Sequence, residues 1–106
     1  MPDFHASAQD IELDGSVLKA HLFDVDGESH EVEIELNDIL GNENGSFLWG
    51  GGGFNDTAED VHLSFEGDDN WPILRARLQN EDGDFVDADV NLAERIGNNN
   101  GEFTFE

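Results

Sequence analysis

Hydrophobic and polar residues alternate one by one along several short stretches of this chain. Leu18, Ala20 and Leu22 are separated by polar residues, and Val32 and Ile34 lie between glutamates. Successive side chains of a β-strand point to opposite faces, so this alternation is typical of strands that bury one face and expose the other. The pattern predicts an all-β protein built from short, half-buried strands.

Turn-forming pairs separate the predicted strands. Asp26-Gly27 and Asp82-Gly83 predict tight two-residue β-hairpins, because a type I′ turn requires positive φ at both central residues. Asn44-Gly45 predicts a further turn that leads into a final short strand at Phe47-Leu48-Trp49. Between the hairpin and this strand, Leu36–Gly41 predicts one short helical turn, with Asn37 or Asp38 able to cap it and Gly41 able to end it.

The second half of the chain repeats the first. A shift of 50 residues aligns the N-terminal parts of the two copies, and after a six-residue insertion a shift of 56 aligns the rest. The paired positions hold apolar residues, glycine or asparagine in a constant order: Phe4 with Phe54, Leu13 with Leu63, Leu18 with Leu74, Ala20 with Ala76, Leu36 with Leu92, and Gly41-Asn42-x-Asn44-Gly45 with Gly97-Asn98-x-Asn100-Gly101. Repeats of this length are marginal alone, so we expect a single domain over 1–106 in which repeats 1–50 and 51–106 share a core.

The insertion falls around Glu66–Pro72, a stretch rich in turn-forming residues where extra length costs little. We interpret its Trp71 as an anchor for the loop; the alternative is an exposed contact residue.

Composition restricts the classes of partner. The 26 acidic residues outnumber the 4 basic ones, for a formal net charge of −22. Such a surface repels phosphate backbones and anionic lipid headgroups, so neither nucleic acid nor membrane is expected as a partner. The chain has no cysteine, which excludes disulfides, thiol catalysis and zinc–thiolate sites. The first residues show neither the basic nor the apolar region of a secretory signal, so we expect a cytoplasmic protein, with unconventional export left open.

Taken in order, the repeated motifs resemble the cyanovirin-N homology lectins. The resemblance covers essentially the whole chain and depends on motifs that are weak singly and strong in this duplicated order: Gly15-Ser16-Val17-Leu18, Ile34-x-Leu36-Asn37, Gly41-Asn42-x-Asn44-Gly45-Ser46, Phe54, Thr57 and Asn98-x-Asn100-Gly101. It implies an all-β fold of two pseudosymmetric halves in which the repeats exchange strands. It also implies binding of α1→2-linked mannose at the ends of high-mannose glycans or glycoproteins, without metal or other cofactor.

Prototype members of this family carry a disulfide in each repeat. The equivalent positions here are Ala8 with Leu22 and Ala58 with Leu78, so apolar burial is expected to replace the crosslinks.

The resemblance implies two sugar sites, each assembled from both repeats. We call the first the N-terminal site; it comprises Asp3, Ala6, Ser7, Phe23, Asp24, Val25, Asp26, Asn98, Asn99 and Asn100. We call its repeat counterpart the opposite site; it comprises Asn42, Glu43, Asn44, Gly52, Gly53, Thr57, Gln79, Asn80, Glu81 and Asp82.

Both sites depart from the family pattern. Ala6, Phe23 and Val25 place apolar side chains where the family's binders have polar ones. In the opposite site, Gly50–Gly53 removes side chains from one wall, and Glu81 stands where a prototype arginine closes over the sugar. The opposite site keeps more polar groups, so we expect weak binding mainly through it, with the N-terminal site nearly inactive.

Three alternatives compete with a lectin. Catalysis is not expected, because no nucleophile or metal-ligand spacing surrounds the four histidines at positions 5, 21, 30 and 62. Calcium binding is not expected in the Asp24–Glu28 or Asn80–Asp84 segments, because each has its glycine at a hairpin position rather than at that of an EF-hand loop. An acidic interaction protein, acting as a nucleic-acid mimic or a cation-binding module, is the alternative that we keep. We expect a monomer, with a strand-exchanged dimer conceivable through the Gly50–Gly53 segment.

Overall fold

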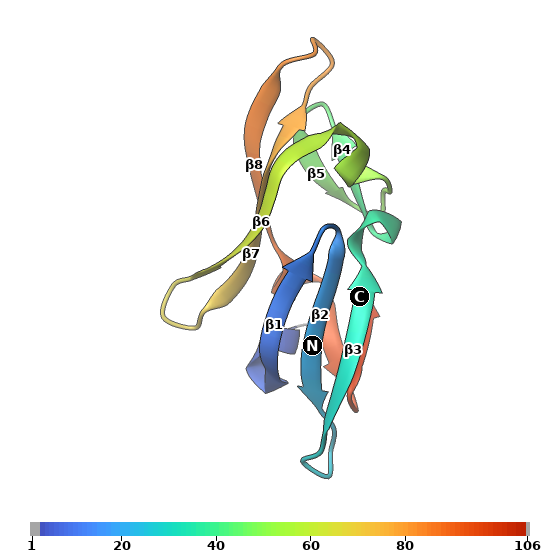
Figure 1. Cartoon of the computed structure of the whole chain (residues 1–106), viewed down its shortest axis with the longest axis vertical. Coiled ribbons are helices and arrows are strands. Elements are labelled where there is room, and N and C mark those ends of the chain that lie inside the picture. The colour runs from blue at the N-terminus through green and yellow to red at the C-terminus, as the bar shows by residue number, and fades with distance from the viewer. Residues whose placement is uncertain (1–2, 106) are drawn as a thin grey trace.

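A computed structural model describes residues 3–105 of the chain as a slender all-β molecule, 50 × 26 × 22 Å, with short 3-10 turns (Figure 1). All strand pairs in this part of the chain are antiparallel. The expectation of an all-β protein is therefore confirmed. None of the helical turns in residues 3–105 is long and apolar enough to span a membrane.

The first repeat forms a three-stranded sheet followed by a separate hairpin. In chain order its elements are η1 Phe4–Ser7, β1 Ala8–Asp14, β2 Val17–Phe23, β3 Ser29–Glu35, η2 Leu36–Asp38, β4 Leu40–Glu43 and β5 Ser46–Trp49. The sheet has the order β1-β2-β3, and β4 pairs with β5 alone. The sequence had predicted one final strand where the structure forms this hairpin, and it had not predicted the turn η1.

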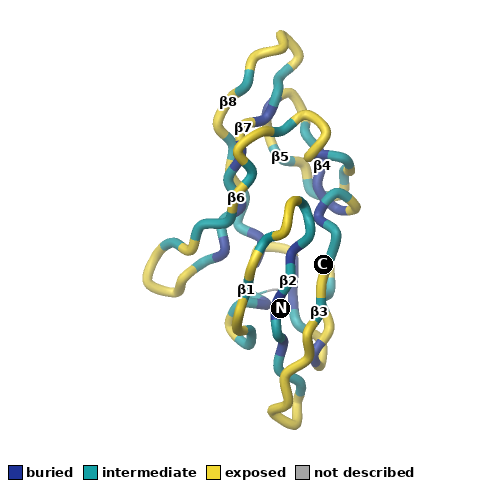
Figure 2. The backbone as a smooth tube through the Cα atoms, in the orientation of Figure 1, coloured by how far each residue is buried: buried dark blue, intermediate teal, exposed yellow. Residues whose placement is uncertain are grey.

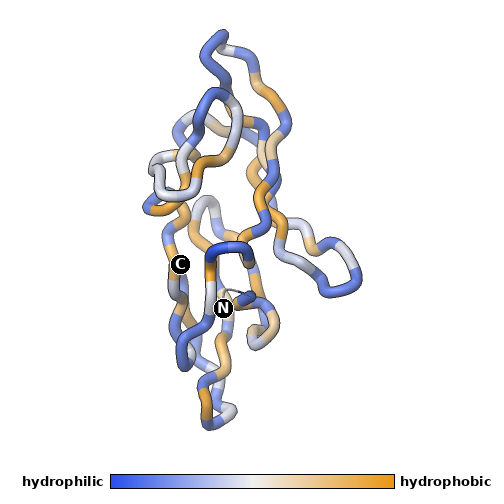
Figure 3. Tube along the Cα trace, turned by 180° about the vertical axis from the view of Figure 1, so that it is seen from behind, coloured by the Kyte–Doolittle hydropathy of each residue, from blue (hydrophilic) through white to orange (hydrophobic). Residues whose placement is uncertain are grey.

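The second repeat has the same order of elements. They are η3 Phe54–Thr57, β6 Ala58–Glu66, β7 Trp71–Gln79, β8 Phe85–Asn91, η4 Leu92–Glu94, β9 Ile96–Asn99 and β10 Glu102–Phe105. The insertion lengthens the β6–β7 hairpin: each of its strands has 9 residues, compared with 7 in β1 and β2. This hairpin projects from the body of the molecule, and its tip is hydrophilic (Figures 1 and 3).

The repeats exchange their hairpins. The β4–β5 hairpin of the first repeat contacts η3 and β8 of the second, while β9 and β10 of the second contact η1 and β3 of the first. Figure 1 shows this exchange: β4 and β5 lie beside β6 and β8 in one half, and the C-terminal strands lie behind β1–β3 in the other. Each half therefore contains a sheet from one repeat and a hairpin from the other.

The buried side chains of both repeats form one cluster. Leu18, Ala20 and Leu22 on β2 are at most 2% exposed, as their alternation predicts, and the equivalent residues of β7 are at most 5% exposed (Figure 2). Aromatic contacts join the exchanged parts. Phe4 meets Phe103 edge-to-face at 5.5 Å between ring centroids, Phe47 meets Phe54 at the same distance, and Trp49 stacks on Phe105 at 5.7 Å.

The positions of the family's crosslinks lie directly opposite one another. Ala8 pairs with Leu22 across β1 and β2, and Ala58 pairs with Leu78 across β6 and β7. Leu22 and Leu78 are fully buried. Apolar packing occupies the place that the resemblance assigned to a disulfide.

The hairpin at Asp26-Gly27 is not the predicted type I′ turn. Residues 24–28 form a five-residue connection, and among them only Gly27 has positive φ (+84°). The amide of Gly27 donates to the carbonyl of Asp24, and the amide of Asp24 donates to the carbonyl of Glu28. Residues 80–84 repeat this arrangement around Gly83. At Asn44-Gly45 the predicted two-residue turn is present, with φ of +49° and +89°.

The helical turn is present, but its ends differ from the prediction. Asn37 and Asp38 lie inside η2, and no side chain caps that turn. Gly41 does not end the turn but lies within β4. Its Cα there lies against the backbone of Gly51 and Gly52. The amides of Gly50 and Gly53 donate to the carbonyls of Ile39 and Asn37. The glycine segment between the repeats is therefore bound closely to η2 and β4.

Candidate functional site

Asn98 joins the three segments that the N-terminal site requires. From β9, its Nδ2 donates to Ser7 Oγ at 2.7 Å and to the carbonyl of Phe23 at 2.9 Å. Its Oδ1 accepts from the amide of Gly101 at 2.8 Å. The N-terminal turn, the β2–β3 hairpin and the C-terminal asparagine loop thus meet at one side chain.

Asp24 organises the β2–β3 loop beside it. Its Oδ1 accepts hydrogen bonds from the amides of Asp26 at 2.9 Å and Glu28 at 3.0 Å. Asn100 reaches across from the other repeat, and its Oδ1 accepts from the amide of Val25 at 3.0 Å. The loop is therefore held from within by a carboxylate and from outside by an amide.

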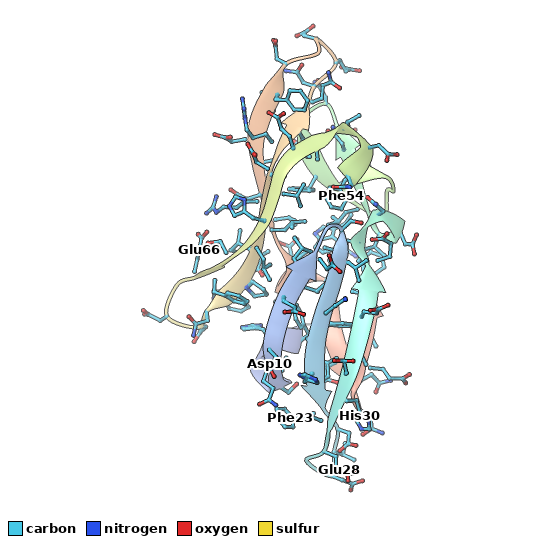
Figure 4. All side chains as sticks on the ribbon, in the orientation of Figure 1. Asp10, Phe23, Glu28, His30, Phe54 and Glu66 are labelled. Atoms are coloured by element: carbon cyan, nitrogen blue, oxygen red, sulfur yellow. The ribbon has the colours of Figure 1, made fainter. Side chains whose placement is uncertain are left out.

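The second oxygen of Asp24 pairs with His30, which is not among the predicted site residues. His30 Nε2 lies 2.6 Å from Asp24 Oδ2. This hydrogen bond raises the pKa of His30 and, with the loop amides, lowers the pKa of Asp24. The His30 ring also lies against Gly101: a Cβ placed there would be 2.7 Å from His30 Cδ2. Figure 4 shows Phe23, Glu28 and His30 together at one end of the molecule.

The opposite site has the same framework. Asn42 Nδ2 donates to Thr57 Oγ1 and to the carbonyl of Gln79, both at 2.8 Å, and Asn42 Oδ1 accepts from the amide of Gly45. Asn44 Oδ1 accepts from the amide of Glu81 at 2.9 Å. Asn80 takes the place of Asp24, accepting from the amides of Asp82 and Asp84 at 3.0 Å each. The two ends of the molecule thus share this framework, but the Asp24–His30 pair has no counterpart at the opposite site.

Both hydrogens of the Asn42 and Asn98 amides are already engaged within the protein. These two residues position the loops and have no free N–H for a ligand. The polar groups left to face a ligand come from the loops that they hold.

The loops themselves differ in chemistry. Phe23, Val25 and His30 at the N-terminal site correspond by the repeat to Gln79, Glu81 and Val86 at the opposite site. Val25 is 85% exposed and has no side-chain hydrogen-bonding group. The aligned repeats place His30 opposite Val86. This difference is the feature of the sequence from which His30 could have been predicted as a site residue.

Other predicted site residues lie farther from these frameworks. Gly52 and Gly53 lie against Gly41 and Asn37 rather than beside Asn42, and no described hydrogen bond connects them to the Asn80 loop. Glu43 and Asn99 are exposed at the ends of the exchanged hairpins. Asp3 donates its amide to the carbonyl of Ala93, and Asp3 and Ala6 border a separate hollow with Trp71.

Asp24, Asp26 and Glu28 form an acidic group whose carboxylate oxygens lie within 4.8 Å of one another. They belong to a segment in which the sequence analysis does not expect calcium binding. Both oxygens of Asp24 already accept hydrogen bonds from the loop or from His30. The Asp24 carboxylate thus supports the hairpin from within, and Asp26 and Glu28 contribute their backbone amides to this support.

Fold and loop clusters together place the chain among known proteins. Residues 4–104 match the family model of the CVNH domain, and the chain belongs to this family of lectins. Its structure is similar to that of the CVNH protein of Gibberella zeae, with 46% identity, a TM-score of 0.94, and coverage of 99% of this chain and 98% of the other.

Two similar structures contain sugars. One is a complex of microvirin with mannobiose, 28% identical with a TM-score of 0.89 over 100% of both chains. The other is a variant of MoCVNH3 in complex with (N-GlcNAc)4, 28% identical with a TM-score of 0.86 over 98% of this chain and 97% of that one.

Proposed function

We propose that this protein binds α1→2-linked mannose at the ends of high-mannose glycans, without metal. The observation that supports this most directly is the convergence of three segments on Asn98, repeated at Asn42. Microvirin, which is similar over its whole length, forms a complex with mannobiose. The MoCVNH3 variant was solved with a GlcNAc oligomer, so the choice of sugar within the family needs its own test.

The loop framework suits a ligand rich in hydroxyl groups. Hydroxyls donate and accept hydrogen bonds, and the loops present carboxylates, amides and backbone groups at fixed positions. Because Asn42 and Asn98 hold these loops before any ligand arrives, little ordering entropy is lost on binding. Neutral hydrogen bonds contribute about 0.5–1.5 kcal/mol each, so a shallow site of this kind binds weakly.

We further propose that the opposite site binds more tightly than the N-terminal site. Its loop carries Gln79, Asn80 and Glu81, all with polar side chains, where the N-terminal site has Phe23, Asp24 and Val25. The Asp24 carboxylate is also committed to the loop amides and to His30. More hydrogen-bonding groups remain for a sugar at the opposite site.

Chemical-shift titration of the labelled protein with Manα1→2Man tests both statements. We expect the larger perturbations in residues 42–45 and 79–83, and smaller ones in 23–26 and 98–101. Chitotetraose is the comparison sugar. If neither end responds to mannobiose, the proposed function is wrong; equal affinities at the two ends would contradict only the preference between sites.

The repeat supplies matched variants for this titration. Q79F/E81V gives the opposite loop two residues of the N-terminal loop, and F23Q/V25E makes the reverse exchange. We expect the first to abolish the stronger binding and the second to strengthen the N-terminal site. If both variants bind like the wild type, the loop side chains do not determine affinity.

The alternative of an acidic interaction protein makes a different prediction. Charge-driven association with a basic partner weakens steeply with salt, whereas neutral hydrogen bonding to a sugar does not. Mannobiose affinity that is unchanged between low and high salt is expected for a lectin.

We propose no catalytic activity, and turnover of a mannoside would contradict this.

A further inference from the structure

One residue beside the N-terminal site differs in kind from its repeat counterpart: His30 corresponds to Val86 at the opposite site. Both side chains lie against the turn glycine of an exchanged hairpin. A Cβ added to Gly101 would be 2.7 Å from His30 Cδ2. One added to Gly45 would be 2.5 Å from Val86 Cγ2. The fold therefore accepts either an imidazole or an aliphatic side chain at this place, and packing alone does not require a histidine.

His30 contacts the carboxylate of Asp24, which is one of the residues predicted for the N-terminal site. Asp24 Oδ1 accepts from the amides of Asp26 and Glu28, so Oδ2 is the oxygen left for a ligand. His30 Nε2 lies 2.6 Å from this Oδ2. The side chain of Asp24 is only 11% exposed, whereas that of His30 is 50% exposed. The more exposed imidazole thus holds the acceptor that a sugar hydroxyl would need.

The opposite site has the same loop but different chemistry at these two positions. Asn80 stands in the place of Asp24, and its Oδ1 accepts from the equivalent amides of Asp82 and Asp84. The rest of its side-chain group is an amide, which does not titrate, and Val86 has no hydrogen-bonding group. Protonation at position 30 can therefore alter the N-terminal site, while the equivalent contact at the opposite site carries no proton to gain or lose.

Three carboxylates face His30 from the elements packed around it. Asp24 and Glu28 belong to the β2–β3 loop, and Glu102 lies on β10. The partner strand β2 places the apolar Leu22 opposite His30. The hydrogen bond to Asp24, followed by the charges of the three carboxylates, raises the pKa of His30 above its ordinary 6.5, against a smaller effect of desolvation. The ring is therefore charged at mildly acidic pH and loses its charge as the pH rises past this region.

We propose that His30 sets the affinity of the N-terminal site by competing with a mannose hydroxyl for Asp24 Oδ2, so that sugar binding there strengthens as the pH rises. A charge-assisted hydrogen bond is roughly twice as strong as a neutral one, so the protonated ring holds Oδ2 most firmly. The loop keeps its shape when the ring is displaced, because the bonds that Asp24 Oδ1 and Asn100 make to the loop amides do not involve it. His30 acts through Asp24 and need not touch the sugar. This inference rests on the proposed function and adds a control of one of its two sites.

The test is chemical-shift titration of the full chain with Manα1→2Man at about pH 5.5 and about pH 8.5, on either side of the usual histidine range. We expect the affinity of the N-terminal site to increase about fivefold to tenfold from the lower to the higher pH, which is the difference between a charged and a neutral hydrogen bond. The opposite site is the internal control, and its affinity should not change. By linkage, saturating mannobiose should also lower the pKa of His30, which NMR titration of the ring measures.

H30V gives the N-terminal site the residue of the opposite site and is the matched variant. It should bind mannobiose equally well at both pH values, and at least as tightly as the wild type at the higher pH. A purely structural role for His30 predicts the contrary, weaker binding at every pH. H30Q, which has a neutral donor at this position, should also remove the pH dependence, so the test stays decisive if H30V does not fold. The other histidines remain in both variants, so any pH dependence that they cause would persist.

The reverse exchange, N80D/V86H, moves the pair to the opposite site. We expect that site to bind mannobiose more weakly than the wild type at about pH 5.5 and to recover as the pH rises to about 8.5. The N-terminal site of the same variant should behave as it does in the wild type. A transferred pair that leaves the opposite site insensitive to pH would contradict the competition.

The outcomes distinguish this inference from the proposed function. If the N-terminal site of the wild type binds mannobiose equally at both pH values, more tightly at the lower one, or at neither, while the opposite site binds, the role of His30 is wrong and the lectin function stands. If H30V and H30Q keep the pH dependence, the role of His30 is also wrong. If mannobiose binds at neither end at either pH, the proposed function fails and this inference fails with it.

Discussion

Asn98 Nδ2 lies 2.7 Å from Ser7 Oγ, although 91 positions separate the two residues in the chain. The same amide group donates to the carbonyl of Phe23, and its oxygen accepts from Gly101. These bonds therefore connect the second repeat's exchanged hairpin to the turn η1 and to the end of β2 in the first repeat.

Replacing Asn98 with alanine should destabilise the protein by about 1–3 kcal/mol, because buried or partly buried groups lose their partners. N42A should cost a similar amount, since Asn42 makes the equivalent bonds to Thr57 and Gln79. Urea unfolding gives both values. N100A, which removes one exposed bond to Val25, is the control and should cost less. An N98A protein as stable as the wild type would contradict the assigned role.

The repeat and the alternation were sufficient to predict the strands and, with the family resemblance, the exchange between halves. They also predict the length of the first hairpin loop, for which the Asp26-Gly27 pair had indicated a different value. Ala20 and Val32 can face each other only if the loop has an odd number of residues, and the observed register pairs them across a five-residue loop. A two-residue loop would have placed Ala20 opposite Glu33, since a slip of one residue exchanges the faces of a strand.

The loop adopts its longer form because Asp24 supplies an alternative to the type I′ turn. Its carboxylate accepts from the amides of Asp26 and Glu28, so Asp26 keeps ordinary backbone angles and Gly27 alone takes positive φ. His30 could not be linked to Asp24 until this register was known. The contact of Trp71 with His5 likewise joins segments whose proximity depends on the fold rather than on any local pattern.

The Asp24–His30 pair should be visible in a pH titration. Its hydrogen bond raises the pKa of His30 above its usual 6.5, and Glu28 and Glu102 act in the same direction. The stability that His30 contributes is therefore complete below about pH 6.5 and is lost as the pH rises through its higher folded value. NMR titration of the His30 ring gives the folded pKa. D24N should lower it, and H30V, which copies Val86, should remove this part of the pH dependence. A His30 that titrates at or below 6.5 in the wild type would refute the pair.

Glu66 and Arg75 should stabilise the projecting hairpin against acid. Two guanidinium nitrogens of Arg75 each lie 2.6 Å from a carboxylate oxygen of Glu66, and this bidentate pair lowers the pKa of Glu66 to about 2. A carboxyl group with a lowered pKa stabilises the folded state above its unfolded value near 4.5 and loses that contribution as the pH falls toward 2. E66Q should therefore be less stable than the wild type at neutral pH and equal to it near pH 2. Urea melts across this range measure the difference, and a gap that persists at pH 2 would point to packing instead of charge.

A disulfide should form readily between positions 8 and 22. Ala8 and Leu22 are direct cross-strand partners, and such pairs lie within the Cα separation that a disulfide spans. In A8C/L22C, closing a loop of about 15 residues should make the oxidised form more stable than the reduced form by up to about 3 kcal/mol. The reduced form should be less stable than the wild type, because the fully buried Leu22 side chain becomes smaller. Thermal melts with and without reductant test both statements, and A58C/L78C is the matched pair in the second repeat.

Gly45 should tolerate alanine much less well than Gly15. Both have positive φ, +89° and +64°, so alanine is strained at either position by about 1–2 kcal/mol. Nothing lies within 4 Å of a Cβ at Gly15, whereas at Gly45 the Cβ would be 2.5 Å from Val86 Cγ2, on the strand that receives the exchanged hairpin.

G45A should therefore be the more destabilised variant, and V86A should recover part of its loss by removing the obstructing methyl group. A double-mutant cycle from urea melts isolates this coupling, which should favour the double variant by more than about 0.5 kcal/mol. If the two changes are additive, Gly45 is required for its backbone angles alone, and the close approach of the exchanged hairpin to β8 does not constrain the turn.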